Sequence, residues 1–469
     1  MTESKLQISI ANGSQQVMGE VGTSIQNNYI NQPVEPDPSD RLVVVLGAGM
    51  DAALGMDTMQ SVLPNIARYL ETERGDEEDK VLRNTIKNVR FKFDKFVEKQ
   101  MNKLVRELDD DIESVCRKVQ NEIDNNPNLN ETDRKLGRII VSIFKKIADI
   151  KMQATIDTET QQLIEEVLET TVTEETLIDF STVTYTPTYH EVISHILRQS
   201  IEQNQSAVLR HVYHNMFDLE RLLADYFFGF FTHQSSPIRT YLYIAWTMWA
   251  YFVREEQRVT PAFSASPLWR ELSEKPCRLI SLNYTTFAQQ TKADAIYFNG
   301  CLSNHLDVEN KNVLDFGAPI SEFSPFDFFK HTLPQELSFE PGEERLPMPD
   351  FIPHLKIKPV ISNRYVEVWH RAGAAMRRAN DIVLLGCSLS SADDFFSEML
   401  CANPQARITF VNNDIDALVP NVCQLFQLTP RRRSVLLRNG RKCYIYNNRI
   451  HLVEADLGSM KSLNEVING

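Results

Sequence analysis

Residues 41–49 read RLVVVLGAG, a run of apolar and β-branched side chains that ends in a glycine turn. Such a run is typical of a parallel strand that is buried on both faces of its sheet. In a doubly wound sheet, a Gly-x-Gly turn after the first strand brings backbone N–H groups close to a bound phosphate. The same turn also occurs where two segments pack tightly, so Gly47-Ala48-Gly49 alone leaves both interpretations open.

Polar or glycine-bearing strand ends follow in the last 200 residues of the chain. Short apolar runs end at Ser281-Leu282-Asn283-Tyr284-Thr285, Phe298-Asn299-Gly300, Val313-Leu314-Asp315-Phe316-Gly317, Gly386-Cys387-Ser388-Leu389 and Val411-Asn412-Asn413. Helical patterns lie between several of these runs, which predicts an α/β fold with a Rossmann-like, doubly wound parallel sheet. Ligands bind beyond the carboxyl ends of the strands in such sheets, so these ends predict a dinucleotide site.

A long helical region separates the first strand from the others. About 230 residues lie between Gly49 and Asn283, and most of them carry helical patterns. The aromatic stripe within residues 190–256 is expected to be core rather than a cofactor site. Prolines crowd residues 320–362, which predicts an irregular excursion.

We therefore divide the chain into four parts. They are an N-terminal arm and linker (1–40), a nucleotide-binding domain (41–65 and 275–428), a large helical insertion domain (66–274) and a C-terminal β segment (429–469). In the arm, residues 6–30 alternate weakly between apolar and polar side chains, and the proline-rich linker QPVEPDPSD follows. The arm is either a docking or oligomerisation element or a loose tail. The C-terminal segment is expected to contain a hairpin with its turn at Asn439-Gly440.

Composition excludes several classes of protein. The 469 residues carry a net charge of −14, which argues against a non-specific nucleic-acid coat. The seven cysteines form no CxxC pair, which disfavours a disulfide framework and a zinc ribbon and fits a reducing cytoplasm. The most apolar stretch, Thr240–Val253, is shorter than the roughly 20 residues of a spanning helix. The basic cluster between Arg431 and Lys442 is either a solvated hairpin face or a contact for an acidic partner or nucleic acid.

Taken in order, these motifs resemble the sirtuin (SIR2-like) domain over about residues 41–65 and 275–425. The resemblance rests on GAG at 47–49 with Gly55 and Thr58 downstream, Asn283-Tyr284, Phe316-Gly317, Gly386–Leu389, and Asn412 or Asn413. It implies that the chain binds NAD+ as a substrate. The implied NAD+-binding residues are Gly47, Ala48, Gly49, Asp51, Thr58, Gly386, Ser388, Asn412 and Asn413. Asn283 would lie beside the nicotinamide ribose.

The sequence also departs from the sirtuin pattern. Asn299 stands where sirtuins carry their general-base histidine, and an amide cannot take up a proton at neutral pH. His305 could substitute for that histidine or be a surface-loop side chain. Asp51 replaces the serine of the glycine loop, and a carboxylate beside a pyrophosphate is unfavourable unless it points away or caps the helix. No four-cysteine module fits between Gly300 and Phe316, so we expect no zinc and no protein deacylation.

The long helical insertion is similar to that of SIR2-like effectors of bacterial anti-phage systems, which cleave NAD+ to nicotinamide and ADP-ribose. The resemblance implies a homo- or hetero-oligomer and a partner encoded in the same operon, such as a nucleotide-processing enzyme or an Argonaute. We expect a cytoplasmic NAD+ hydrolase with Asn283, Asn299 and His305 as catalytic candidates and with no membrane or direct nucleic-acid contact. The alternative is a catalytically degenerate subunit that binds a nucleotide or scaffolds a partner.

Overall fold

The computed structural model describes residues 41–100, 219–352, 362–389 and 394–467, with internal gaps at 58, 98, 228, 233, 309–310, 312, 317 and 439. It also describes isolated positions between 117 and 185. Thr58, Gly317 and the arm of residues 1–40 lie outside these described residues. Most of the predicted helical insertion, between 101 and 218, lies outside them too.

An eight-stranded sheet organises the described residues, with strand order β11-β12-β13-β10-β9-β1-β4-β5. The strands are β1 (Leu42–Leu46), β4 (Arg278–Ser281), β5 (Ile296–Tyr297), β9 (Asp381–Leu385), β10 (Arg407–Asn412), β11 (Ser434–Arg438), β12 (Arg441–Tyr446) and β13 (Ile450–Glu454). The six strands from β13 to β5 are parallel to one another. The predicted Rossmann-like α/β fold is confirmed.

The path of the chain through this sheet creates a switch point. From the central strand β1 the chain moves outward to β4 and β5, then returns to the opposite side of β1 at β9 and continues to β10 and β13. This is the order of a doubly wound dinucleotide-binding sheet. Val43, Val44 and Val45 are fully buried in the central strand, as the apolar run at 41–49 predicts.

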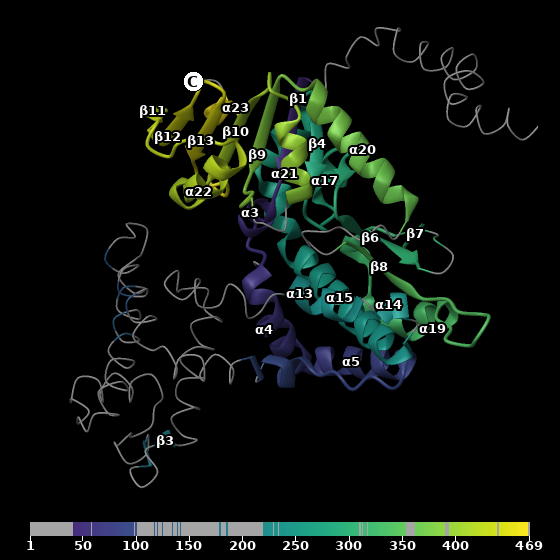
Figure 1. Cartoon of the computed structure of the whole chain (residues 1–469). Helices are drawn as coiled ribbons and strands as arrows, with labels where there is room; N and C mark the ends of the chain where they lie inside the picture. Colours follow the sequence, from purple (N-terminus) through teal and green to yellow (C-terminus); the bar gives the residue numbers. More distant parts are fainter. Residues whose placement is uncertain are drawn as a thin grey trace, which may run out of the picture.

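Helices flank the sheet, and several extend beyond the carboxyl ends of its strands (Figure 1). They include α3 (Ala48–Ala52), α4 (Met59–Leu70), α5 (Glu73–Ile86), α13 (Leu219–Phe227), α14 (Gly229–Thr232), α15 (Ser235–Ala265), α16 (Pro267–Glu274), α17 (Phe287–Thr291), α20 (Asn363–Arg378), α21 (Asp394–Cys401), α22 (Ile415–Leu425) and α23 (Asn464–Ile467). Figure 1 shows α4, α5, α13 and α15 together beyond α3, the helix that follows β1. None of the helices in the described ranges combines the length and apolarity needed to cross a bilayer.

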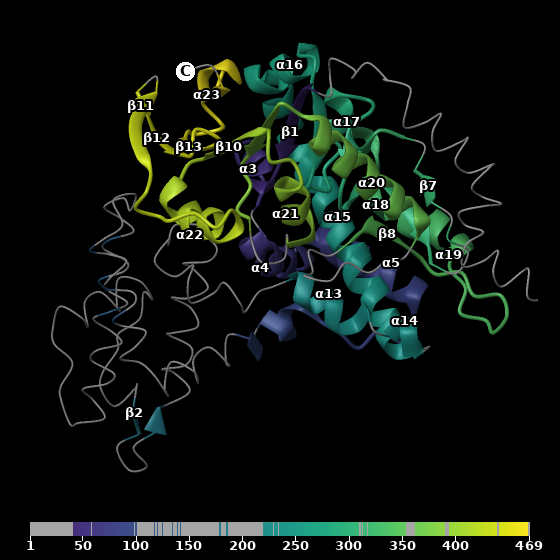
Figure 2. The same cartoon turned by 45° about the horizontal axis from the view of Figure 1, so that its top comes forward.

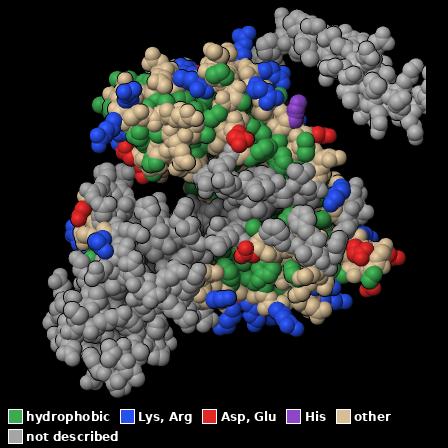
Figure 3. All heavy atoms as spheres, viewed as in Figure 1, with side chains coloured by type: hydrophobic (Ala, Val, Ile, Leu, Met, Phe, Trp, Pro, Cys, Tyr) green, Lys and Arg blue, Asp and Glu red, His purple; other side chains and the backbone are tan. Residues whose placement is uncertain are grey.

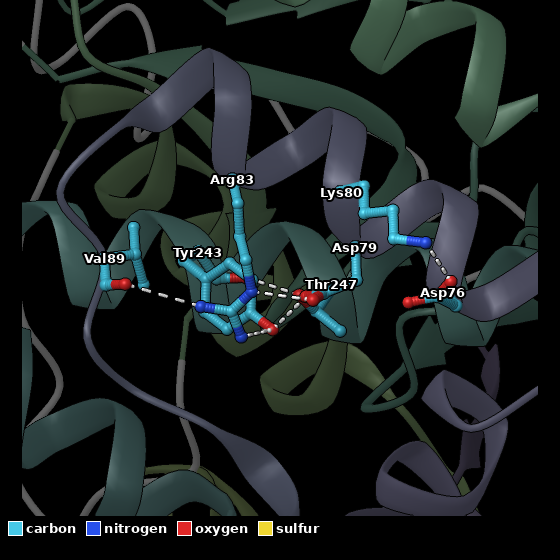
Figure 4. A network of polar contacts seen from close by, with 7 residues as sticks. All are labelled: Asp76, Asp79, Lys80, Arg83, Val89, Tyr243 and Thr247. Atoms are coloured by element: carbon cyan, nitrogen blue, oxygen red, sulfur yellow. Dashed lines mark hydrogen bonds and ion pairs between the residues drawn. The ribbon is translucent and has the colours of Figure 1, made fainter.

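Helix α15 carries part of the aromatic stripe, and its Tyr241, Trp246 and Trp249 are buried in the core, as predicted. The indole Nε1 of Trp246 donates to the carbonyl of Pro347 at 3.0 Å, and that of Trp249 donates to Leu302 at 2.9 Å. A polar network ties the same helix to α5 (Figure 4). In it, Arg83 Nη2 donates to the Tyr243 hydroxyl at 2.6 Å, and that hydroxyl hydrogen bonds to Asp79.

One expectation about local structure is wrong. Residues 320–362 are not wholly irregular, because β8 (Pro347–Phe351) is a buried strand that pairs with β6 (Gly300–Asp307) in a three-stranded sheet completed by β7 (Val313–Asp315). Its prolines are tolerated because β8 is an edge strand, where a missing N–H donor costs little. Within the predicted insertion, β2 (Ile178–Asp179) and β3 (Thr184–Tyr185) form a short antiparallel pair.

The predicted C-terminal hairpin is present as β11 and β12, and it joins the main sheet through β13. Helices α22 and α23 lie on opposite sides of these strands (Figure 2). The C-terminal segment thus extends the sheet that carries the glycine turn.

Candidate functional site

The glycine turn after β1 meets the loop after β9 at the switch point of the sheet. The amide of Gly47 donates to the carbonyl of Leu385 and the amide of Gly49 donates to that of Gly386, each at 2.9 Å. Gly386 in turn donates to Val411 at the end of β10 at 2.9 Å. The carboxyl ends of β1, β9 and β10 are therefore joined by backbone hydrogen bonds into one surface.

This close approach accounts for the glycines. A Cβ on Gly49 would lie 2.6 Å from the Cα of Gly386, and a Cβ on Gly47 would lie 2.6 Å from the carbonyl oxygen of Gly386. Gly386 itself has a φ of +66°, a conformation that L side chains rarely adopt. Tight packing, one of the two interpretations of the Gly-x-Gly turn, is thus present.

The amides of the turn are not all available to a ligand. The amides of Gly47 and Gly49 already donate to carbonyls of the loop after β9. Ala48 is exposed, and no protein acceptor binds its amide among the described residues. A phosphate at this turn would therefore meet the amide of Ala48 above a platform of packed glycines.

Asn283 follows β4 and reaches across to the glycine turn. Its Nδ2 donates to the carbonyl of Gly47 at 2.9 Å, and its backbone amide is held by the Ser281 hydroxyl at 3.1 Å. The side chain is partly exposed. One Nδ2 hydrogen is bonded to the turn, and the side-chain oxygen remains as an acceptor for a ligand. The structure thus brings Asn283, Gly47, Gly49 and Gly386 together.

Asp51 is buried beneath this surface. Thr285 Oγ1 donates to its Oδ2 at 2.8 Å, and Oδ1 has no hydrogen-bond partner among the described residues. Burial raises the pKa of Asp51 to about 7, although hydrogen bonds from Thr285 and Asn283 act to lower it. Asp51 therefore points inward, toward Thr285, and not toward a bound pyrophosphate.

A second buried carboxylate enters the site from the helical part. Glu256 on α15 accepts a hydrogen bond from the amide of Thr286 at 2.8 Å and another from the Thr286 hydroxyl. Burial raises its pKa to about 7; the Thr286 bonds lower it and the charge of Asp51 raises it. No local pattern in the sequence marks Glu256, because its contact with Thr286 spans 30 residues and depends on the rotation of α15 about its axis.

Two of the catalytic candidates lie away from the exposed surface. Asn299 is buried, and its Nδ2 donates to the carbonyl of Leu282 at 3.0 Å, so it holds the segment that precedes Asn283. His305 is 3% exposed in β6, and its ring stacks on Phe316 with centroids 4.8 Å apart. Its Nε2 lies 3.0 Å from Glu336. The surface-loop interpretation of His305 is wrong, because the residue lies in a strand of the three-stranded sheet.

The remaining candidates flank the switch point. Ser388 is exposed after β9, where its carbonyl accepts a hydrogen bond from Asn421 at 3.2 Å. Asn412 ends β10 with its Nδ2 3.5 Å from the carbonyl of Cys387, and Asn413 is exposed beside it. The described residues hold no group of three or more His, Cys, Asp or Glu side chains suited to a metal ion.

No protein-family profile matches the sequence, and no curated protein matches it. Among solved structures, the chain is similar to a SIR2 homologue in complex with NAD at 16% identity and a TM-score of 0.27, over 42% of this chain and 66% of that one. It is similar to a Sir2 homologue variant with ADP-ribose at 17% identity and a TM-score of 0.25, over 36% and 63%. A Sir2 protein bound to an acetylated peptide gives 13% identity and 0.26, over 49% and 76%. The chain thus spans just under two thirds of the first two structures.

Proposed function

We propose that the chain is a SIR2-like enzyme that binds NAD+ at the switch point and hydrolyses it to nicotinamide and ADP-ribose. The observation that carries this proposal is the position of Asn283, a partly exposed amide fixed to the glycine turn directly above a buried carboxylate. The similar structures include a complex with NAD and one with ADP-ribose, which agrees with this choice of ligand.

In the proposed reaction the bond between C1′ of the ribose and the nicotinamide nitrogen breaks, and its electron pair leaves with nicotinamide. Positive charge then develops on the ribose, a water oxygen bonds to C1′, and the water loses its proton to solvent. The side-chain oxygen of Asn283 orients the ribose or the water. Ionised Asp51, buried beneath Asn283, stabilises the developing positive charge through the low-dielectric interior.

This arrangement does not require a histidine base. An oxocarbenium-like ribose is a strong electrophile, so its capture by water needs positioning more than proton removal. The departure at Asn299 is then compatible with hydrolysis, because Asn299 supports the backbone before Asn283. His305 has no part in the proposed step.

We further propose that the enzyme is a cytoplasmic effector of an anti-phage system, activated by a partner or trigger and working as an oligomer. Glu256 supports a route for such control, since it links α15 to the segment after Asn283. A movement of the helical part would shift the 283–286 segment through this contact and so change the position of the Asn283 side chain.

The test is nicotinamide release from NAD+ by the full chain, alone and with the product of the neighbouring gene and its trigger. We expect Asn283→Ala to lower the rate by about 10²–10³-fold, the range seen when one preorganised polar group is removed. The matched control is Asn363→Ala, an exposed asparagine on α20, which should keep the full rate. Full activity of Asn283→Ala would overturn the proposal. NAD+ binding measured by calorimetry without turnover under any condition would favour the degenerate binding subunit instead.

A further inference from the structure

Strand β11 leaves one edge of the main sheet unpaired. It is the terminal strand of the sheet and, within the described part of the chain, pairs only with β12. Its three central side chains are apolar and exposed: Val435 is 61%, Leu436 49% and Leu437 80% accessible. An exposed apolar edge strand is a template for another strand, and proteins usually cover or charge such edges.

The helices that cover the neighbouring strands stop short of β11. On one face, α22 is fixed to β12 because the Tyr444 hydroxyl donates to Asp416 at 2.6 Å. On the other face, α23 is fixed by the ion pair between Arg441 and Glu465. Because side chains alternate along a strand, Val435 and Leu437 extend one face and Leu436 the other. Both faces therefore continue past their helices as apolar surface, and a further strand would fit between them.

The edge is also positively charged at the start of β11. Arg431 and Arg432 are exposed, and neither forms an ion pair with the described residues. Arg433 lies over the ring of Tyr444 and 4.0 Å from Asp416. In Figure 3, basic and hydrophobic side chains adjoin over β11 and β12, at the upper left. The occupant should therefore be an extended segment with apolar alternation and acidic charge.

We propose that the occupant is the N-terminal arm of this chain, with part of residues 6–30 added to the sheet as a strand beside β11. Residues 1–40 hold five acidic residues (Glu3, Glu20, Glu35, Asp37 and Asp40) against one basic residue, Lys5. Leu6, Ile8 and Ile10 alternate with polar side chains, as a half-buried strand requires. A strand paired to β11 through its backbone would match the alternation. Of the acidic residues, Glu20 lies within residues 6–30, and Glu35, Asp37 and Asp40 lie in the linker that follows.

The linker has the length and the direction that this placement needs. A strand beyond β11 would lie six strand spacings from β1, or about 29 Å at about 4.8 Å each. The proline-rich residues 32–40, in an extended polyproline conformation, span about 28 Å. Because β11 points the same way as β13 and β1, it begins at the edge where the linker enters β1. The arm would therefore run antiparallel to β11.

Hydrogen exchange of the full chain tests the docking. Leu437→Lys should speed exchange at residues 434–438 and at residues 6–30 together, by at least tenfold, because one docked unit is released. The matched control is Leu314→Lys on β7, an exposed leucine far along the chain, which should change neither segment. Exchange in the arm that is already as fast as in a free peptide, in the unmodified chain, would overturn the proposal.

Removing the arm and adding it back as a peptide gives a second, independent test of the docking. A chain that begins at residue 33 should lose the protection of residues 434–438, and a synthetic peptide of residues 1–32 should restore it. The same peptide with Glu3→Gln and Glu20→Gln should bind more weakly at low salt. Unchanged protection after truncation would contradict the docking. Protection that returns with rising concentration of the truncated chain alone would also contradict it, since β11 would then be pairing with a second copy.

Discussion

Two buried aspartates, Asp350 in the three-stranded sheet and Asp51 in α3 beside the main sheet, differ in what surrounds them. Asp350 in β8 accepts a hydrogen bond from the Tyr365 hydroxyl, and Arg364 Nη1 lies 3.8 Å from its Oδ2. Asp51, at the carboxyl edge of the main sheet, has Thr285 as its donor and forms no ion pair with any described residue. A buried carboxylate beside a cation is typical of a structural role, whereas one held by neutral donors with a raised pKa is typical of a functional site.

The glycines of the two regions differ in the same way. Gly386, at the switch point, has no room for a side chain, whereas Gly342, in the loop before β8, has nothing within 4 Å of an added Cβ. Both have positive φ, of +66° and +86° respectively. The region at the carboxyl ends of the main-sheet strands is therefore the more tightly packed of the two. It also holds Asp51, the carboxylate without an ion pair among the described residues, and this combination is expected of a preorganised ligand site.

The largest expected effect is on stability. Gly386→Ala should lower the free energy of unfolding by about 3 kcal/mol or more, because the methyl group meets Gly49 and the backbone φ is unfavourable. Gly342→Ala should cost only about 1 kcal/mol, from the backbone conformation alone. Urea denaturation of the two variants measures the difference. Equal losses would show that the two loops are not packed as described.

The next largest loss of stability should follow from breaking the contact between α15 and the 283–286 segment. Glu256→Ala leaves the buried amide and hydroxyl of Thr286 without their acceptor, at a cost of about 2–3 kcal/mol. The adjacent Glu255→Ala removes an ion pair with the half-exposed Arg258 and should cost less than about 0.5 kcal/mol. Thermal unfolding ranks the two variants, and a smaller loss for Glu256→Ala than for Glu255→Ala would break the proposed link.

The free energy of unfolding should also depend on pH through Asp51 and Glu256, the two buried acids near the carboxyl ends of the main-sheet strands. Their folded pKa values, about 7, lie above those of the unfolded chain, so the folded state holds these protons more tightly. The stabilisation that this supplies is complete below about pH 4 and is lost as pH rises through 7. Each acid should contribute a fall of about 2 kcal/mol between pH 5 and pH 7.

The matched variants separate Asp51 from Asp350 in that titration. Asp51→Asn should remove about half of the fall in stability between pH 5 and pH 7, because Glu256 still titrates in this variant. Burial raises the pKa of Asp350 as well, but Arg364 and Tyr365 oppose that rise. Asp350→Asn should therefore leave most of the fall in place and lower stability at every pH. An unchanged profile for Asp51→Asn would contradict the buried, cation-free site.

The smallest expected effect concerns His305. His305→Gln should leave the rate of nicotinamide release per folded molecule within about threefold of the unmodified chain, because the ring lies in the three-stranded sheet against Phe316 and Glu336. Circular dichroism gives the folded fraction for this comparison. A fall as deep as that expected for Asn283→Ala would place His305 in the chemistry and break the contrast between the two sheets.

Much of the main sheet could be predicted from the sequence. The run at 41–49 and the ends at Asn283, Gly386 and Asn412 all lie where strand periodicity puts them, because buried parallel strands leave a strong local signal. The three-stranded sheet could not be predicted in full, since two prolines hide the edge strand β8.

The chemistry of the site was only partly predictable. Asn283 carries a local signal, a polar residue after an apolar strand, and the structure brings it to the glycine turn. The inward orientation of Asp51 depends on its hydrogen bond with Thr285. The contact of Glu256 with Thr286 depends on how α15 packs against the sheet. Such contacts join residues far apart in the sequence, so no local pattern reveals them.

A structure of the full chain with ADP-ribose would test whether a dinucleotide binds where the loops after β1 and β9 meet. We expect the pyrophosphate within hydrogen-bond distance of the Ala48 amide and a ribose beside the side chain of Asn283. ADP-ribose bound elsewhere, or in contact with neither residue, would contradict it.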